Sequence, residues 1–204
     1  MSEAVKPKSF FRRSFPFWLM LAIFSAPFIA ATFLYEGGTT FSLGKAGNKG
    51  DLISPVRRID SVQMENLLGG SINSDDLLGK WTLVTVGSKA CGDACLENMY
   101  KMRQIRLATG RERSRVNRLY ILSDENRKQI ATLLEDFDGM AVVLGESGTI
   151  EAFNLKPTPW QGEIEGGIYI IDPMGNFMMA YKPGFEAEGI LKDLKRLLKL
   201  SRIG

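Results

Sequence analysis

The first strong pattern along the chain is a run of apolar residues without charge, from Phe15 to Tyr35. About 20 apolar residues are what a helix needs to cross the hydrocarbon core of a bilayer, so the run predicts one transmembrane helix at residues 15–35. Basic residues precede it within residues 1–14, and only Glu36 follows closely. By the positive-inside rule we expect a cytoplasmic N-terminus and a single-pass anchor in the inner (cytoplasmic) membrane, with the C-terminal domain facing the periplasm.

The alternative to a retained anchor is a cleaved signal peptide, with a cut near Ala30 and Ala31. The apolar region of a signal peptide spans about 7 to 15 residues. Here the bulky side chains of Phe33, Leu34 and Tyr35 continue the run beyond that site. The pattern therefore favours a retained anchor.

Residues 36–55 are rich in glycine and polar side chains and have no periodicity, which is typical of a flexible linker. The remaining stretch, about 150 residues, has the usual size of one globular domain. We therefore expect four parts: a cytoplasmic N-terminus (1–14), a transmembrane helix (15–35), a flexible linker (36–55) and one domain (56–204).

Within the domain, short apolar runs alternate with stretches of helical periodicity. The first part predicts a β-hairpin between Ile59 and Asn73, followed by a helical turn capped by Ser74. Further strands are predicted at residues 81–86, 119–122, 141–144, 168–171 and 177–181, and helices after the cysteines to about residue 110, at 123–136 and at 186–200. This order is similar to the thioredoxin-like arrangement. It predicts an α/β fold, a mixed sheet with helices on both faces.

Two of the predicted helices carry apolar stripes that should pack on the sheet. The stripe of the helix after the cysteines is formed by Leu96, Met99, Tyr100, Met102, Ile105 and Leu107. The stripe of the last helix is formed by Ile190, Leu191, Leu194, Leu197 and Leu198, with basic side chains opposite.

The composition restricts the chemistry, because the chain contains no histidine. This excludes Ser-His and Cys-His catalysis and histidine metal sites. The formal net charge of +3 is too small to indicate a polyanionic partner. A basic segment between Lys101 and Arg118 is interpreted as a solvated face, with anionic lipid or an acidic partner domain as alternatives; nucleic acid is not expected outside the cytoplasm.

The chain has two cysteines, Cys91 and Cys95, and they are the candidate catalytic residues. They follow the predicted strand 81–86 directly, and open α/β sheets bind ligands beyond the carboxyl ends of their strands. If a helix begins near Gly92, its N-H groups and dipole stabilise a thiolate at Cys91. The spacing also places both sulfurs within reach of a disulfide. Such a pair can exchange disulfides or hold one soft ion such as Cu(I).

The alternative interpretation of Cys91 and Cys95 is a structural disulfide in an oxidising compartment. A disulfide that closes so short a loop removes little entropy from the unfolded chain, because the gain grows with loop length. The spacing therefore favours a redox or metal role without excluding the structural one.

Three stretches resemble the Sco/SenC family, the membrane-anchored thioredoxin-like proteins associated with copper insertion into cytochrome c oxidase. Residues 78–84 (Leu-Gly-Lys-Trp-Thr-Leu-Val) look like the family's start of the central strand. Residues 91–95 (Cys-Gly-Asp-Ala-Cys) are similar to its Cys-Pro-Asp-x-Cys motif, with Gly92 in place of proline. Residues 168–175 (Ile-Tyr-Ile-Ile-Asp-Pro-Met-Gly) resemble its late strand and turn. By this resemblance Cys91 and Cys95 are the thiol pair.

The sequence departs from the family before the late strand. Copper-binding members use a histidine a few residues before that strand, and residues 161–167 contain none. Glu163, Glu165 or a methionine are the substitutes available in the sequence. A thioredoxin-type site is also incomplete, since that family carries a cis-proline where this chain has Gly166 and Gly167.

The resemblance implies a membrane-tethered assembly factor for a respiratory copper enzyme, cytochrome c oxidase. It would act by thiol-disulfide exchange, with Cys91 as the attacking sulfur, or by holding Cu(I) transiently between Cys91 and Cys95. The expected partner is a respiratory oxidase subunit or another extracytoplasmic thiol protein. Two alternatives remain: a non-catalytic thioredoxin-like scaffold with a structural disulfide, and a general extracytoplasmic disulfide reductase.

Overall fold

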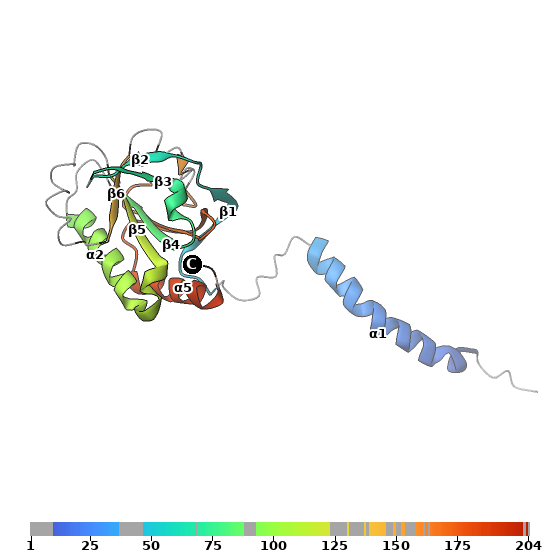
Figure 1. Ribbon diagram of the computed structural model, residues 1–204. Coiled ribbons are helices and arrows are strands. Elements are labelled where there is room, and N and C mark those ends of the chain that lie inside the picture. Colours follow the sequence, from blue (N-terminus) through green and yellow to red (C-terminus); the bar gives the residue numbers. More distant parts are fainter. Residues whose placement is uncertain are drawn as a thin grey trace, which may run out of the picture. The chain divides into compact units, whose positions relative to one another are not determined.

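The computed structural model in Figure 1 divides into two compact units, Met1–Gly47 and Asn48–Gly204, which are described separately. It describes residues 10–36, 47–67, 69–87, 93–122, 130, 137, 139–145, 149, 152–153, 158–160, 162, 164–201 and 203.

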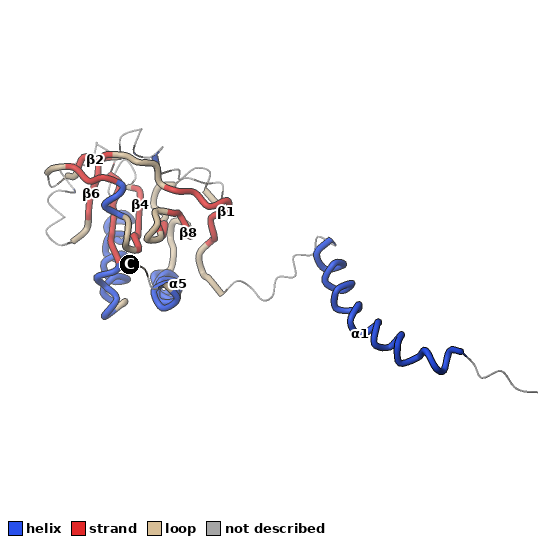
Figure 2. Tube along the Cα trace, turned by 45° about the vertical axis from the view of Figure 1, so that its right-hand side comes forward, coloured by secondary structure: helices blue, strands red, loops and turns tan. Residues whose placement is uncertain are grey.

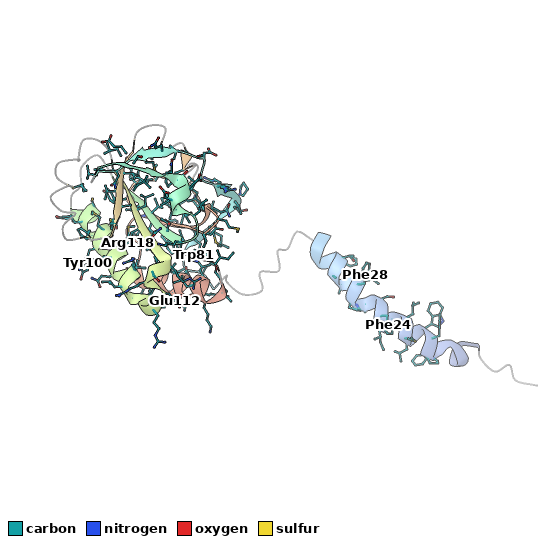
Figure 3. The ribbon with its side chains drawn as sticks, viewed as in Figure 1. Phe24, Phe28, Trp81, Tyr100, Glu112 and Arg118 are labelled. Atoms are coloured by element: carbon teal, nitrogen blue, oxygen red, sulfur yellow. The ribbon has the colours of Figure 1, made fainter. Side chains whose placement is uncertain are left out.

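Among its described residues, the first unit has one helix, α1 (Phe10–Glu36). Its segment Phe15–Phe33 has a mean hydropathy of 1.7, and none of that segment is buried inside the protein. The side chains of Phe24 and Phe28 project outward from the helix (Figure 3). The helix is therefore long and apolar enough to cross a membrane, as the sequence predicts.

The second unit is built on a six-stranded mixed sheet with the strand order β1-β8-β7-β4-β5-β6. Its strands are β1 (Asp51–Arg58), β4 (Trp81–Val86), β5 (Val116–Leu122), β6 (Ala141–Leu144), β7 (Ile168–Ile171) and β8 (Asn176–Tyr181). β4, β5 and β6 run parallel, whereas β7 is antiparallel to β4 and β8, and β1 is antiparallel to β8. The predicted thioredoxin-like mixed sheet is confirmed.

β4 lies at the centre of the sheet because all six of its residues are apolar or β-branched and can be buried on both faces. Helices α2 (Asp93–Ala108) and α5 (Ala187–Leu200) pack on one face; Figure 2 shows α5 almost end-on beside the strands. Among the described residues, the other face is covered by the hairpin β2–β3 and the 3-10 helix η1 (Ser74–Leu77). Most of the helix predicted at 123–136 lies outside the described residues.

The predicted N-terminal hairpin is confirmed as β2 (Gln63–Glu65) paired with β3 (Ser71–Asn73). The prediction that Ser74 caps the next turn is wrong, because Ser74 is the first residue of η1 and Asn73 is its cap. The Asn73 N-H donates to the carboxylate of Asp76, at 2.8 Å. The hydroxyl of Ser74 instead accepts from the backbone of Val62, at 3.1 Å, which ties the turn to the chain before β2.

The structure places a strand inside the predicted linker. β1 begins at Asp51, so residues 51–55 belong to the sheet, where Asp51 and Leu52 pair with β8. β1 is an edge strand on which only Ile53 is buried, so its sequence lacks the alternation that marks a half-buried strand. The proline at position 55 is tolerated at such an edge.

The helical stripes are confirmed for α5 and partly corrected for α2. Ile190, Leu194 and Leu198 of α5 are buried. On α2, Tyr100 and Leu107 are 54% and 44% exposed, although the sequence predicts them in the core; Figure 3 shows Tyr100 on the outer side of the domain. Both lie off the true buried stripe, which is formed by Cys95, Asn98, Met99, Met102 and Ile105.

Candidate functional site

A cleft of about 600 Å³ lies where the carboxyl end of β4 meets the first turns of α2. It is lined by Thr85, Val86, Gly87, Ala94, Cys95, Asn98, Tyr120, Trp160, Gly162, Glu165, Gly166, Lys182 and Pro183. The cleft thus occupies the strand end at which open α/β sheets bind ligands.

Cys95 lies in the first turn of α2 and reaches the cleft from the helix side. It is 8% exposed and disulfide-bonded. The only other cysteine in the sequence, Cys91, lies outside the described residues. The position of one predicted site residue is therefore known, and the catalytic role of the pair stays a prediction.

Cys95 has a polar neighbour in Tyr120, which comes from the adjacent parallel strand β5. The register places Tyr120 opposite Thr85, one residue before the end of β4. Its Oη lies 2.8 Å from Cys95 Sγ. Because a disulfide sulfur carries no proton, the tyrosine hydroxyl is the donor.

The tyrosine hydroxyl is held in its protonated form. Burial, and to a smaller extent the negative charge of Glu165, raise the pKa of Tyr120 to about 12. Both effects disfavour the phenolate. Tyr120 is therefore a neutral hydrogen-bond donor at any physiological pH.

Gly87 makes room for this hydroxyl. A Cβ on Gly87 would lie 2.1 Å from Tyr120 Oη, a distance that real side chains do not reach. The Gly87 backbone is itself fixed, because its N-H donates to the carbonyl of Ile121 at 2.8 Å. Only glycine at this position lets the tyrosine reach Cys95.

The opposite wall of the cleft is bound to β4 by backbone hydrogen bonds. The Gly166 N-H donates to the carbonyl of Val86 at 3.0 Å, and the Thr85 hydroxyl donates to the carbonyl of Gly167 at 2.8 Å. Asn98 on α2 donates from its side chain to the carbonyl of Gly166 at 2.9 Å. Gly166 has a φ of +72°, which L side chains rarely adopt, so a glycine is required there.

Trp160 forms another part of the wall, and it is fixed by an aromatic partner. Its ring stacks on Tyr169 of β7 with centroids 6.0 Å apart. Sequence reasoning leaves the role of Trp160 undecided between a loop anchor and a docking residue. The structure assigns it to the cleft beside Cys95.

The substitute metal ligands suggested by the sequence are only partly brought together. Glu165 lines the cleft with Cys95, whereas Glu163 lies outside the described residues. Met99 and Met102 are fully buried in the core on the α2 face. Within the part of the chain that the structure describes, no group of three or more histidine, cysteine or acidic residues is placed to hold a metal ion.

The basic segment proves to be less of a free surface than the sequence predicts. Lys101 pairs with Glu97 at 2.7 Å, and Arg106 donates to the carbonyl of Val116 at 2.8 Å. Arg115 donates to the carbonyls of Leu198 and Ser201 at the end of α5, which satisfies helix-terminal acceptors. Arg118 is 2% exposed. These cations serve the packing of α2, β5 and α5.

Sequence reasoning misses Tyr120, Gly87 and Asn98 as site residues. The sequence contains only weak signals that these residues belong to the site. Tyr120 lies in a predicted core strand, and Gly87 resembles an ordinary glycine at the end of a strand. Asn98 lies three residues after Cys95 on α2, so helical spacing alone places it on the same side of the helix. The approach of Tyr120 to Cys95 depends on strand order, which places β5 beside β4.

Comparison with known proteins supports the fold. The family described as "Transmembrane-like, thioredoxin-like, C-terminal domain" matches residues 81–201, more than half of the chain. No curated protein matches the sequence.

Several solved structures share the fold at low sequence identity. ScoI of Bradyrhizobium japonicum, solved with copper bound, is 23% identical, with a TM-score of 0.52, covering 69% of this chain and 99% of its own. BsSco, a Sco-family cytochrome c oxidase assembly protein with a disulfide switch, is 19% identical, with a TM-score of 0.56, covering 74% and 98%. A thiol:disulfide interchange protein of Chlorobium tepidum is 17% identical, with a TM-score of 0.55, covering 72% and 97%. Because the family model spans most of the domain, the chain belongs to the transmembrane-like, thioredoxin-like C-terminal domain family.

Proposed function

We propose that this chain is a membrane-tethered, Sco-like assembly factor for a respiratory copper enzyme, cytochrome c oxidase. It acts through Cys91 and Cys95, by thiol-disulfide exchange or by holding Cu(I) transiently. The observation that carries the proposal is a disulfide-bonded Cys95 in the first turn of α2, lining a cleft at the carboxyl end of β4. The Sco proteins and the thiol:disulfide interchange protein among the structural neighbours support the same class of chemistry.

The exchange reaction begins with the reduced pair. The Cys91 thiolate attacks one sulfur of a client disulfide, and the other client sulfur leaves as a thiolate and takes up a proton. The Cys95 thiolate then attacks Cys91 in the mixed disulfide, and the second client sulfur leaves and is protonated. The cysteine pair loses two electrons and becomes a disulfide, while the client disulfide gains two electrons and becomes a dithiol.

The copper branch uses the same two sulfurs in their reduced state. Two thiolates are a soft donor set that Cu(I) accepts, and Cu(I) is here a cargo to be delivered. The carboxylate of Glu165 in the cleft is a hard donor and a poor third ligand for Cu(I). The pair is therefore expected to hold Cu(I) through its two sulfurs alone.

The proposed location is the periplasmic side of the inner membrane, with α1 as the anchor. Two observations support it: the length and hydropathy of α1, and the basic residues before it. The proposed partner is an oxidase subunit or another extracytoplasmic thiol protein.

Complementation of a deletion strain tests the proposal. Cys91→Ser and Cys95→Ser should each abolish restoration of oxidase activity, whereas Met174→Leu, which changes an exposed sulfur outside the cleft, should leave it intact. Full activity with Cys91→Ser would contradict the proposal.

Cu(I) titration of the full chain in detergent tests the copper branch. The reduced wild type should bind one equivalent, and the variant lacking both cysteines should bind none. Binding that survives loss of both sulfurs would contradict the assignment of Cys91 and Cys95.

The second candidate function is a scaffold module whose disulfide is structural. The burial of Cys95, at 8% exposure, favours it. The two functions predict different reduction potentials, because a structural disulfide lies below about −300 mV and a labile one lies higher.

A further inference from the structure

We propose that Tyr120 is a positioning residue that sets the balance between the disulfide and the dithiol of the cysteine pair. Its hydroxyl is fixed on Cys95 Sγ and stabilises the reduced sulfur more than the oxidised one. This inference rests on the proposed function, since it assumes that the pair cycles between the two states.

The first support is the geometry of the contact. Tyr120 is 1% exposed, and its Oη lies 2.8 Å from Sγ. Among the residues that the structure describes, Sγ is the hydrogen-bond partner of this hydroxyl. A buried hydroxyl needs a partner, so the phenol is directed at the sulfur.

The second support is the difference between the two forms of the acceptor. A disulfide sulfur is a weak hydrogen-bond acceptor. A thiolate carries a full negative charge, and a hydrogen bond to a charged acceptor is about twice as strong as a neutral one. Because the donor is the same in both states, the hydrogen bond shifts the equilibrium towards the reduced pair.

The third support is that the surrounding backbone is shaped for the hydroxyl. Gly87 lies against Tyr120, and a Cβ there would overlap Oη at 2.1 Å but the ring carbon Cζ only at 2.7 Å. Phenylalanine at position 120 would therefore leave unfilled the space beside Gly87 that the tyrosine hydroxyl occupies. The packing fixes the donor before reduction occurs.

The consequence for the reaction is a disulfide that is easily reduced. A reduced form stabilised by Tyr120 raises the reduction potential of the pair and keeps Cys95 available as the resolving thiolate. It also favours the dithiol, which is the form that can take up Cu(I).

Equilibration of the full chain, in detergent, with reduced and oxidised glutathione tests the inference. At equilibrium, the protein disulfide and two glutathione molecules give the protein dithiol and one glutathione disulfide. Tyr120→Phe should shift this equilibrium about tenfold towards the protein disulfide, which for a two-electron couple is about 30 mV.

The matched control is Tyr169→Phe. Tyr169 is also 1% exposed, and its hydroxyl donates to the carbonyl of Ile164 at 3.3 Å, an acceptor that is oxygen rather than sulfur. This variant should leave the equilibrium unchanged. An equal shift in both variants, or no shift in Tyr120→Phe, would overturn the inference.

A second variant keeps the test decisive if Tyr120→Phe does not fold. Difluorotyrosine at position 120 keeps the ring and donates more strongly, so it should shift the equilibrium towards the dithiol; a shift in the other direction would overturn the inference. A wild-type disulfide that resists the whole glutathione range would instead refute the proposed function, and this inference with it.

Discussion

Two buried tyrosines in this domain, Tyr181 and Tyr120, are both packed against a glycine, but their hydroxyls have different acceptors. Tyr181 and Tyr120 are 5% and 1% exposed, and each ring lies against a glycine that leaves no room for a Cβ, Gly50 and Gly87 respectively. The Tyr181 hydroxyl donates to the carboxylate of Asp193 at 2.8 Å and has a longer contact, 3.9 Å, with the thioether sulfur of Met179, whereas the Tyr120 hydroxyl donates to Cys95 Sγ.

The acceptor of Tyr181 serves the fold. Asp193 on α5 also accepts from the backbone N-H groups of Lys49 and Gly50, at 2.7 and 3.0 Å, and so ties the start of the domain to its last helix. The acceptor of Tyr120 is one whose charge changes when the disulfide is reduced. Under the proposal, the same donor is structural where its acceptor is constant and functional where its acceptor changes state.

The comparison also shows that cavity size does not identify the site. Tyr181 lines a hollow of about 820 Å³ beside α5, larger than the cleft at Cys95. Among the residues lining this larger hollow there is no sulfur, and three of them are lysines: Lys49, Lys182 and Lys192. Chemistry, rather than volume, distinguishes the two.

The largest expected effect is the loss of the structural acceptor. Asp193→Ala removes the carboxylate acceptor of three donors: the N-H groups of Lys49 and Gly50 and the hydroxyl of Tyr181. We expect the free energy of unfolding to fall by about 3 kcal/mol, measured by urea unfolding. Glu188→Ala, on the exposed side of the same helix, is the control. A loss under about 1 kcal/mol would contradict the structural role.

The next largest effect on stability is expected from two glycine substitutions. Gly50→Ala and Gly87→Ala both force a Cβ against a tyrosine ring and should each destabilise the fold by about 2 kcal/mol. Only Gly87→Ala should also change the thiol-disulfide equilibrium, because only Tyr120 touches Cys95. Equal redox effects in the two variants would remove the distinction between the tyrosines.

A smaller effect comes from removing the hydroxyl of Tyr181. Tyr181→Phe should reduce the free energy of unfolding by about 1.5 kcal/mol, since the hydrogen bond is made to a charged acceptor. The glutathione equilibrium of this variant should match that of the wild type. The account is wrong if Tyr181→Phe shifts the equilibrium as much as Tyr120→Phe does.

The pH dependence of unfolding under alkaline conditions tests the burial of the Tyr120 hydroxyl. Burial raises the pKa of Tyr120 from its ordinary value of 10.0 to about 12, with Glu165 as the second cause. A group with a raised pKa in the folded state stabilises the fold fully below its unfolded pKa, and loses that contribution as pH rises through the folded one. The stability difference between wild type and Tyr120→Phe should therefore be constant below about pH 10 and shrink between 10 and about 12. A constant difference across that window would contradict the burial of the neutral hydroxyl.

The smallest expected effect is that of Glu165→Gln. Removing this charge takes away the lesser of the two causes that raise the pKa of Tyr120, so that pKa should fall while burial keeps it above 10.0. Stability should change by less than about 0.5 kcal/mol, as for most surface substitutions. Ultraviolet titration of tyrosinate measures the shift; an increase would contradict the assigned cause.

The sequence predicts the main fold because its central strands and last helix carry strong patterns. Residues 81–86, 141–144 and 168–171 are continuous runs of apolar or β-branched residues, and the structure has strands with the same bounds. The edge strand β1 is not predictable in this way, because burial of Ile53 alone leaves no periodic signal. The sequence predicts Ser74 as the cap of η1, but local sequence does not distinguish it from Asn73, which is an equally good cap.

The sequence predicts the site residues that are close together in the chain, but not those that are brought together by strand pairing. Cys91 and Cys95 are visible because they are the only cysteines and follow a buried strand. Tyr120 is 25 residues away from Cys95, and only the parallel pairing of β4 with β5 brings it to the sulfur. Contacts between neighbouring strands require the strand order, which a single sequence does not contain.

The reduction potential of the wild-type full chain tests the central claim most directly, because the proposed chemistry requires the disulfide at Cys95 to open and close. Equilibration against a graded series of dithiol buffers should give a potential above about −300 mV, in the range of labile pairs. A potential well below that value would show a structural disulfide and would contradict the account.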